Sequence, residues 1–350
     1  MTYKETLFFV GKCLTINHEA HNKRIVEDHL KNNTVDWNNV VKLSTEHYVF
    51  PALYCNLRKA DFLKYLPEDL VGYMKHITDL NRERNTQIIQ QAKEINELLL
   101  SHNITPIFLK GTGNLLEGLY NDIAERMVGD IDILFSTKEV FEAYEIIIKA
   151  SYKKTHNDYS EIHRHLSPLV HKNKISRIEV HKEMTIPKFA KDFNYKTISS
   201  NLFKKDNFHF LNYIDQVKLT IIAKQINDHG QYYNDISLRN VYDLYLLSQK
   251  ADTHTNTLSS NKKLFPHLNN FLAATKITTN SEFITFKKNK KTNDYTKLFL
   301  KLIDDNEFRK RYRSKTKNKI RFLSISNKFL RAFYRKEYFT YMIKRIKSYF

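Results

Sequence analysis

The segment from Asp130 to Phe135 constrains this chain most, because acidic and apolar residues alternate along its first four positions. Residues two apart in a β-strand lie on the same face. The pattern therefore predicts a strand with Asp130 and Asp132 side by side on one face and Ile131 and Ile133 toward a core. Two neighbouring carboxylates repel each other, so they need a cation or exposure to water.

A third acid has the same setting further along the chain. Glu179 lies between Ile178 and Val180 in a second predicted strand, 177–181. If this strand neighbours the first, three carboxylates meet on one sheet face. Such a set suits Mg²⁺ or Mn²⁺, and two ions there can hold the attacking and leaving oxygens of a displacement at phosphorus. The alternative is a surface strand whose outward positions happen to be acidic.

A possible phosphate-binding turn precedes the paired acids. The bulky, β-favouring run 104–109 ends at Lys110 and Gly111. Gly111 permits close approach of the backbone to a phosphate, and the amides of Gly111 and Thr112 lead into a helix N-terminus that favours anions. The Thr112 hydroxyl could add a contact, and Lys110 could pair with either phosphate or the acids. Arg126 could bind a triphosphate with both arms of its guanidinium, or it is a surface arginine in a loop.

The order of expected elements predicts an α+β fold. A β-α-β-α-β-β order between 104 and 185 is typical of an α/β core with a small mixed sheet, flanked by N-terminal and C-terminal helical regions. A chain of 350 residues has room for several such modules. The expected regions are an N-terminal helical region at 1–103, the core at 104–185, a helical C-terminal domain at 186–286 and a basic aromatic helical tail at 287–350.

Several of these motifs occur together in one known family. They are Lys110-Gly111, Tyr120, Arg126, Asp130-Ile-Asp132-Ile-Leu134 and Glu179-x-His181, with Trp37, His47 and Pro51 before them and His229 and Arg239-x-x-x-Asp243 after them. In this combination the chain resembles the uncharacterised bacterial nucleotidyltransferase family of the polymerase-beta-like superfamily. The resemblance extends over about 35 to 250 and leaves the basic tail out. The acids begin 19 positions after Gly111, a spacing that suits this family rather than the superfamily at large.

The resemblance implies an enzyme that uses a divalent metal, Mg²⁺ or Mn²⁺, as two ions. It would move a nucleoside monophosphate from an NTP to an acceptor hydroxyl and release pyrophosphate. Asp130, Asp132 and Glu179 would be the metal-binding and catalytic residues. The acceptor stays open between an RNA, such as a tRNA end modified by toxin-like relatives, and a small molecule or sugar. The alternative is a catalytically inactive relative that binds RNA or membrane, although keeping three mutually repelling acids favours the enzyme.

Three further residues are candidate contacts to the substrate or to the metal ligands. His181 shares a strand face with Glu179, so it lies near the acids either as such a contact or as a structural histidine. Arg239 and Asp243 are four residues apart on an expected helix. They either form a helix ion pair or place that helix over the nucleotide pocket. A zinc site built from His163, His165, His171 and His181 is a further alternative.

The net charge of +19 is concentrated in the tail. Residues 287–350 carry 21 Lys or Arg and five acids, a net charge of +16, which leaves +3 for the rest. Phe322, Ile325, Phe329 and Phe333 recur at helical intervals, with Lys and Arg on a different face. Such a helix could bind RNA through phosphates and stacked bases, could lie on an anionic membrane, or could pack its aromatic face on the protein body.

The sequence also favours a cytoplasmic protein, either free or peripheral to the membrane. Cys13 and Cys55 are too few for a disulfide framework. Leu7 to Val10 is too short an apolar run for a signal peptide, and the chain has no stretch that approaches the roughly 20 apolar residues of a membrane helix.

Overall fold

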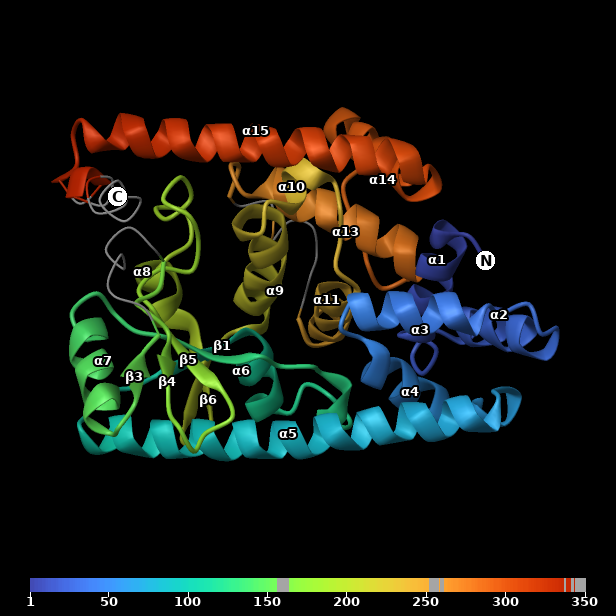
Figure 1. The fold of residues 1–350 in the computed structure, drawn as a ribbon, viewed down its shortest axis with the longest axis horizontal. Coiled ribbons are helices and arrows are strands. Elements are labelled where there is room, and N and C mark those ends of the chain that lie inside the picture. The colour runs from blue at the N-terminus through green and yellow to red at the C-terminus, as the bar shows by residue number, and fades with distance from the viewer. Residues whose placement is uncertain (156–163, 252–257, 259–260, 337, 341–342, 344–350) are drawn as a thin grey trace.

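The computed structural model of this protein describes residues 1–155, 164–251, 258, 261–336, 338–340 and 343. Two long helices, α5 (Glu68–Ser101) and α15 (Asn306–Ala332), form opposite edges of the molecule, with the sheet and the shorter helices between them (Figure 1). One continuous cluster of buried apolar residues includes side chains from the N-terminal helices, the sheet and the C-terminal helices.

The N-terminal region is helical, as predicted. Its helices are α1 (Tyr3–Cys13), α2 (Ala20–Lys31), α3 (Trp37–Glu46), α4 (Phe50–Lys59) and α5. Thr2 and Glu5 form a capping box that starts α1, and Pro51 occupies the first turn of α4, where its missing N–H costs nothing. The buried face of α5 includes Ile88, Ala92, Ile95 and Leu99, which are three or four residues apart and so lie on one side of the helix, toward the core.

A seven-stranded mixed sheet forms the centre of the fold and confirms the α+β class. Its strands are β1 (Ile107–Leu109), β2 (Asp130–Leu134), β3 (Lys153–Lys154), β4 (Leu169–Val170), β5 (Arg177–His181), β6 (Leu202–Lys205) and β7 (Phe208–Leu211), in the order β3-β4-β5-β2-β1-β7-β6. The pairs β2–β5 and β1–β7 are parallel, and the others are antiparallel. Helix α6 (Lys110–Glu117) follows β1 directly, and α7 (Val140–Lys149) follows β2.

The sheet continues past residue 185, where the sequence predicts only helices. Strands β6 and β7 form a hairpin in which Lys205 pairs with Phe208 around the two-residue turn Asp206-Asn207. Asp206 adopts a left-handed conformation, with φ of 53°. Asp and Asn tolerate the left-handed conformation better than most residues, so the Asp-Asn pair is the local signal for this turn. The strand expected at 165–170 is also shorter, because only Leu169 and Val170 pair regularly and His165 forms an isolated bridge to His181.

The C-terminal half is helical beyond this hairpin. The short helix α8 (Tyr195–Ile198) precedes the hairpin, and α9 (Tyr213–Ile222), α10 (Gly230–Tyr233), α11 (Leu238–Lys250), α13 (Phe265–Thr279), α14 (Lys290–Asp304) and α15 follow it. Helix α9 continues into a π-helical turn, Ala223–Asn227. Among the described residues, none of the helices combines the length and the hydrophobicity needed to cross a bilayer.

Helix α15 is attached to the body through its first half. The Tyr312 hydroxyl donates to the carbonyl of Tyr232 at 3.0 Å, and the Arg313 guanidinium lies 2.8 Å from the Asp235 carboxylate. The apolar stripe in its second half, which includes Phe322 and Phe333, is exposed. The expectation that this stripe packs on the body is therefore not met among the described residues, because these side chains are exposed.

Candidate active site

The three carboxylates lie on adjacent strands. In the parallel pair β2–β5, Asp130 is in register with Arg177 and Asp132 with Glu179. Ile131 is fully buried. The face of β2 opposite the carboxylates is therefore the one that packs against the core, as predicted. The carboxylate oxygens of Asp132 and Glu179 and a ring nitrogen of His181 all lie within 4.8 Å of one another. This group can therefore hold a metal ion.

Two basic side chains contact the same oxygen of Asp132. Lys110 Nζ lies 2.5 Å and His181 Nε2 2.6 Å from Asp132 Oδ1. Lys110 adopts a left-handed conformation, with φ of 53°, which is strained for a residue with a side chain. Of the two roles left open for Lys110, pairing with the acids is the one the structure shows.

Arg177 links the other two acids. Its Nη2 atom lies 3.1 Å from Asp130 Oδ2 and 3.1 Å from Glu179 Oε1. His165 Nε2 also approaches Glu179, at 4.0 Å. Sequence reasoning missed Arg177, although its position two residues before Glu179 places both side chains on the same face.

The environment separates the acidities of the paired aspartates. Burial and the neighbouring charges of Asp132 and Glu179 raise the pKa of Asp130. Burial also opposes ionisation of Asp132, but the Lys110 ammonium and the His181 ring more than offset it and lower the pKa of Asp132 below its usual range. Asp132 is thus the firmly ionised member of the pair. The Arg177 guanidinium beside Asp130 does not offset the burial and the acidic neighbours of Asp130, so Asp130 would gain more from a bound metal.

The turn at the start of α6 holds β2 in place. The Thr112 hydroxyl is buried and donates to the carbonyl of Asp130 at 2.7 Å. The structure thus gives this hydroxyl a backbone partner, and its expected contact to a phosphate stays a prediction. A Cβ at Gly111 would lie 3.0 Å from Val128 and 3.3 Å from the Arg126 guanidinium. Gly111 therefore permits close packing on these two residues, and its predicted approach to a phosphate stays a prediction.

Arg126 is buried and paired with Asp243. Its Nε lies 3.0 Å from both carboxylate oxygens of Asp243, its Nη2 lies 2.9 Å from Oδ2, and its Nη1 donates to the carbonyl of Met127. The Tyr120 hydroxyl donates to the same carboxylate at 2.7 Å. These bonds engage all three nitrogens of the guanidinium in contacts within the protein, and the expected contact of Arg126 with a triphosphate stays a prediction. The network joins the loop before β2 to α11.

Arg239 does not pair with Asp243, which corrects the expected helix ion pair. Its guanidinium lies over the ring of Tyr48, 5.0 Å from the centroid, and its buried Nε has no hydrogen-bond partner in the described part of the chain. Burial and the nearby charge of Arg126 lower the pKa of Arg239. Arg239 is thus a half-buried cation beside the site, and its Nε can still donate a hydrogen bond.

Arg164 is a second such cation, which the sequence analysis missed. No ion pair or side-chain hydrogen bond involves it among the described residues, and burial lowers its pKa while the carboxylates of Asp228, Asp132 and Glu179 act against that shift. No local motif marks Arg164, because its neighbours come from other elements.

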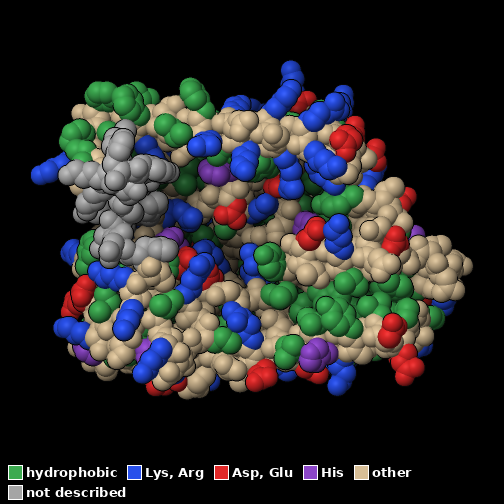
Figure 2. Space-filling model, viewed as in Figure 1, with side chains coloured by type: hydrophobic (Ala, Val, Ile, Leu, Met, Phe, Trp, Pro, Cys, Tyr) green, Lys and Arg blue, Asp and Glu red, His purple; other side chains and the backbone are tan. Residues whose placement is uncertain are grey.

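A hollow crosses the middle of the face shown in Figure 2, between the sheet and the edge formed by α15. Lys, Arg, Asp and Glu side chains gather in it. Mixed charge of this kind suits a polyanionic substrate that arrives with metal ions.

Comparison with known proteins agrees with this geometry. A model of the uncharacterised nucleotidyltransferase family matches residues 33–273. The chain belongs to this family. It is therefore a nucleotidyltransferase, an enzyme that uses an NTP as substrate. Searches among curated proteins and among solved structures give no match.

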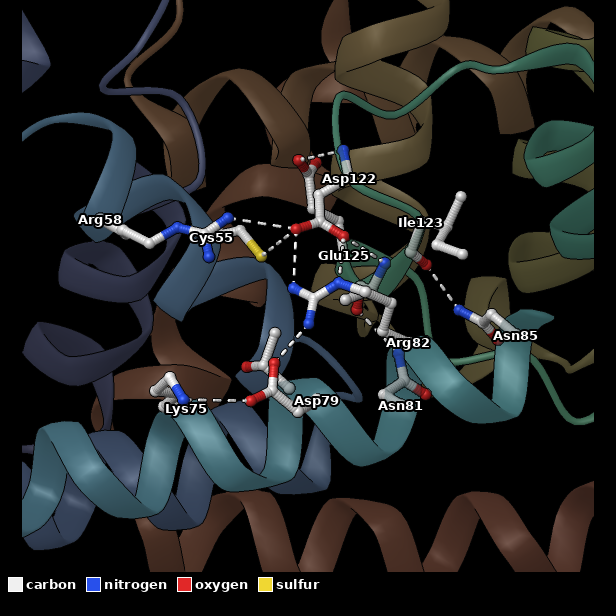
Figure 3. Close-up of polar contacts among 12 residues, drawn as sticks. Cys55, Arg58, Lys75, Asp79, Asn81, Arg82, Asn85, Asp122, Ile123 and Glu125 are labelled. Atoms are coloured by element: carbon white, nitrogen blue, oxygen red, sulfur yellow. Dashed lines mark hydrogen bonds and ion pairs between the residues drawn. The ribbon is translucent and has the colours of Figure 1, made fainter.

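A second network of polar contacts in the nucleotidyltransferase holds the segment that precedes β2 (Figure 3). Sequence reasoning also missed this network. Arg82 of α5 binds the Asp122 carboxylate through Nε at 3.1 Å and Nη2 at 2.8 Å, and Arg58 adds a contact at 3.1 Å. Asn85 donates to the carbonyls of Ile123 and Arg126 at 2.6 and 2.7 Å. Asp122 and Glu125 form a capping box, and their three-residue spacing is the signal that could have predicted this turn.

The zinc alternative finds little support in the described residues of the nucleotidyltransferase. His165 and His181 are neighbours, with ring centroids 5.4 Å apart, whereas His171 packs against Tyr152. His163 lies outside the described residues.

Proposed function

We propose that this nucleotidyltransferase moves a nucleoside monophosphate from an NTP to an acceptor hydroxyl and releases pyrophosphate, with two Mg²⁺ or Mn²⁺ ions held by Asp130, Asp132 and Glu179. The observation that carries the proposal is the parallel register of β2 and β5, which sets Asp132 opposite Glu179. Carboxylate oxygens are the donors that Mg²⁺ prefers.

The donor set fits divalent ions on electrostatic grounds. Three carboxylates share one site, and burial together with the charges of Asp132 and Glu179 raises the pKa of Asp130 in spite of the nearby Lys110 and Arg177. Bound ions would supply the missing positive charge, polarise the α-phosphate and favour the alkoxide form of the acceptor.

The reaction forms a bond from the acceptor oxygen to the α-phosphorus and breaks the bond from that phosphorus to the pyrophosphate oxygen. The hydroxyl proton passes to Glu179, which also completes one metal site. Glu179 suits this role because it lies at the edge of the acid cluster, within reach of His165 and His181 at 4.0 and 3.7 Å. These rings orient the carboxylate.

Binding of the triphosphate falls to the cations around the acids. The Lys110 ammonium already lies at the acid cluster, in contact with Asp132. Once a metal neutralises Asp132, Lys110 would contact a phosphate oxygen instead. Arg239 and Arg164 add guanidinium groups without ion-pair partners among the described residues. Arg126, held by Asp243, positions the turn at Gly111.

The decisive experiment follows the label of the NTP. The protein is incubated with Mg²⁺, with each NTP labelled at either the α- or the γ-phosphate, and with cell RNA or a metabolite extract. We expect α-label in one acceptor fraction and γ-label in pyrophosphate, which also identifies the acceptor as RNA or as a small molecule or sugar. γ-Label in the acceptor would instead indicate a kinase.

Glu179→Gln provides the control for the site. It keeps the shape and removes the charge, so turnover should fall by at least about 100-fold while NTP binding persists. Glu145→Gln, at an exposed position of α7, should leave both unchanged. Turnover of Glu179→Gln at the wild-type rate would remove this residue from the catalytic set.

A further inference from the structure

The second half of α15 presents an apolar stripe to solvent. Phe322, Ile325, Phe329 and Phe333 recur every three or four residues, which places them on one side of the helix. Their exposed fractions range from 52% for Phe329 to 73% for Phe333. Leu330 beside them is also exposed. A contiguous exposed stripe of this kind indicates a binding surface rather than chance exposure.

The same helix is strongly basic. Residues 306–332 contain ten Lys or Arg and a single acid, Glu307, a net charge of +9. Arg321 and Arg331 lie on a different side of the helix from the stripe. In Figure 2, apolar side chains gather over the C-terminal end of α15, and Lys and Arg side chains gather over its other half. The helix is therefore amphipathic, with low overall hydrophobicity and a basic polar face.

Three kinds of partner could cover such a stripe, and their chemistry differs. A second copy of the chain would bring two helices of charge +9 together, which costs electrostatic free energy. RNA would match the charge, but the aliphatic side chains of Ile325 and Leu330 have no ring on which a base can stack. An anionic bilayer matches both features, since its acyl chains accept the stripe and its headgroups attract the Lys and Arg.

We propose that α15 docks this protein on an anionic lipid bilayer, with the stripe Phe322, Ile325, Phe329 and Phe333 inserted at the interface. The first half of the helix stays on the body, through Tyr312 and Arg313.

Vesicle co-sedimentation of the full-length protein tests the proposal without any nucleotide, so its outcome is independent of catalysis. The probes are vesicles of phosphatidylcholine alone and of phosphatidylcholine with phosphatidylglycerol. We expect binding to the vesicles that contain phosphatidylglycerol, weakening as salt is added. Substituting Ser at Phe322, Phe329 and Phe333 together should reduce this binding by at least about tenfold.

Matched controls separate lipid binding from unfolding. Phe141 on α7 is similarly exposed, at 58%, so Phe141→Ser should bind like the wild type, whereas Phe333→Ser alone should already bind less. Both variants should keep the wild-type melting temperature, since neither ring is buried. The proposal is overturned if the wild-type protein does not bind vesicles that contain phosphatidylglycerol at low salt, or if the triple variant binds them as well as the wild type. Loss of RNA binding or of a dimer in the triple variant, with vesicle binding kept, would overturn it too.

Discussion

The Lys110 ammonium lies 2.5 Å from Oδ1 of Asp132, so a lysine side chain neutralises the aspartate that the proposed mechanism assigns to metal. The strained backbone at Lys110 and its place directly after β1 hold the ammonium at the acid cluster. Metal and lysine therefore compete for one carboxylate, and this competition can be measured.

Lys110→Met should strengthen metal binding while it weakens the metal-free protein. The variant leaves Asp132 with His181 as its remaining basic contact, so the pKa of Asp132 should rise and the metal-free melting temperature should fall. Mn²⁺ should then raise the melting temperature by more than it does in the wild type. Thermal unfolding with and without Mn²⁺ measures both effects, with Lys149→Met on α7 as the control. An equal increment in the variant and the wild type would show that Lys110 does not compete with metal.

Asp130→Asn and Asp132→Asn should have different effects on stability although both abolish turnover. Burial and neighbouring acids disfavour the ionised form of Asp130. A neutral side chain at this position should therefore leave the metal-free protein at least as stable as the wild type. Asp132→Asn removes the partner of Lys110 and His181, which should cost roughly 3 kcal/mol. Chemical denaturation without metal distinguishes them, and equal losses of stability would contradict this account.

Asp243→Asn should destabilise the protein by about 3–5 kcal/mol, because it leaves the buried Arg126 guanidinium without its anion. Arg126→Met should also destabilise it. The double variant should be more stable than the sum of the two losses predicts, since it removes both charges. Urea unfolding of the three variants closes the cycle. Additive losses would show that the two side chains act independently.

Arg239→Ala should raise KM for the NTP by about tenfold or more and change kcat less. The unpartnered Nε of Arg239 and its place beside Arg126 suit a contact to the triphosphate that forms in the ground state. Steady-state kinetics with varied NTP separates the two constants. Arg24→Ala, on the distant α2, provides the control, and an unchanged KM in Arg239→Ala would remove Arg239 from the nucleotide site.

Glu117 should make the protein less stable as pH rises. Burial raises the pKa of Glu117 from 4.5 to about 7, so the folded state holds this proton more tightly than the unfolded state. The stabilisation is complete below pH 4.5 and is lost as the pH rises to about 7, by at most roughly 3 kcal/mol. Glu117→Gln should remove that loss and should be more stable than the wild type at about pH 8. Melting curves across this range test the sign, and a wild type that gains stability from pH 5 to 8 relative to Glu117→Gln would reverse it.

Local patterns in the sequence were sufficient for the elements that carry the acids. The alternation around Asp130 and the bounds of 177–181 predict β2 and β5 correctly, because a period of two reports directly which side of a strand is buried. The long stripe of α5 is equally local. These patterns also place each acid on a sheet face before any tertiary contact is known.

Tertiary structure decided which of these residues meet. The parallel register that sets Asp132 opposite Glu179, the pairing of β7 with β1 and the choice of Arg126 over Arg239 as partner of Asp243 all join residues far apart in the chain. A period in the sequence tells which face of an element is buried, but the partner across that face depends on how the whole chain packs. For the same reason, the sequence alone did not reveal that the Thr112 hydroxyl donates to a backbone carbonyl of β2.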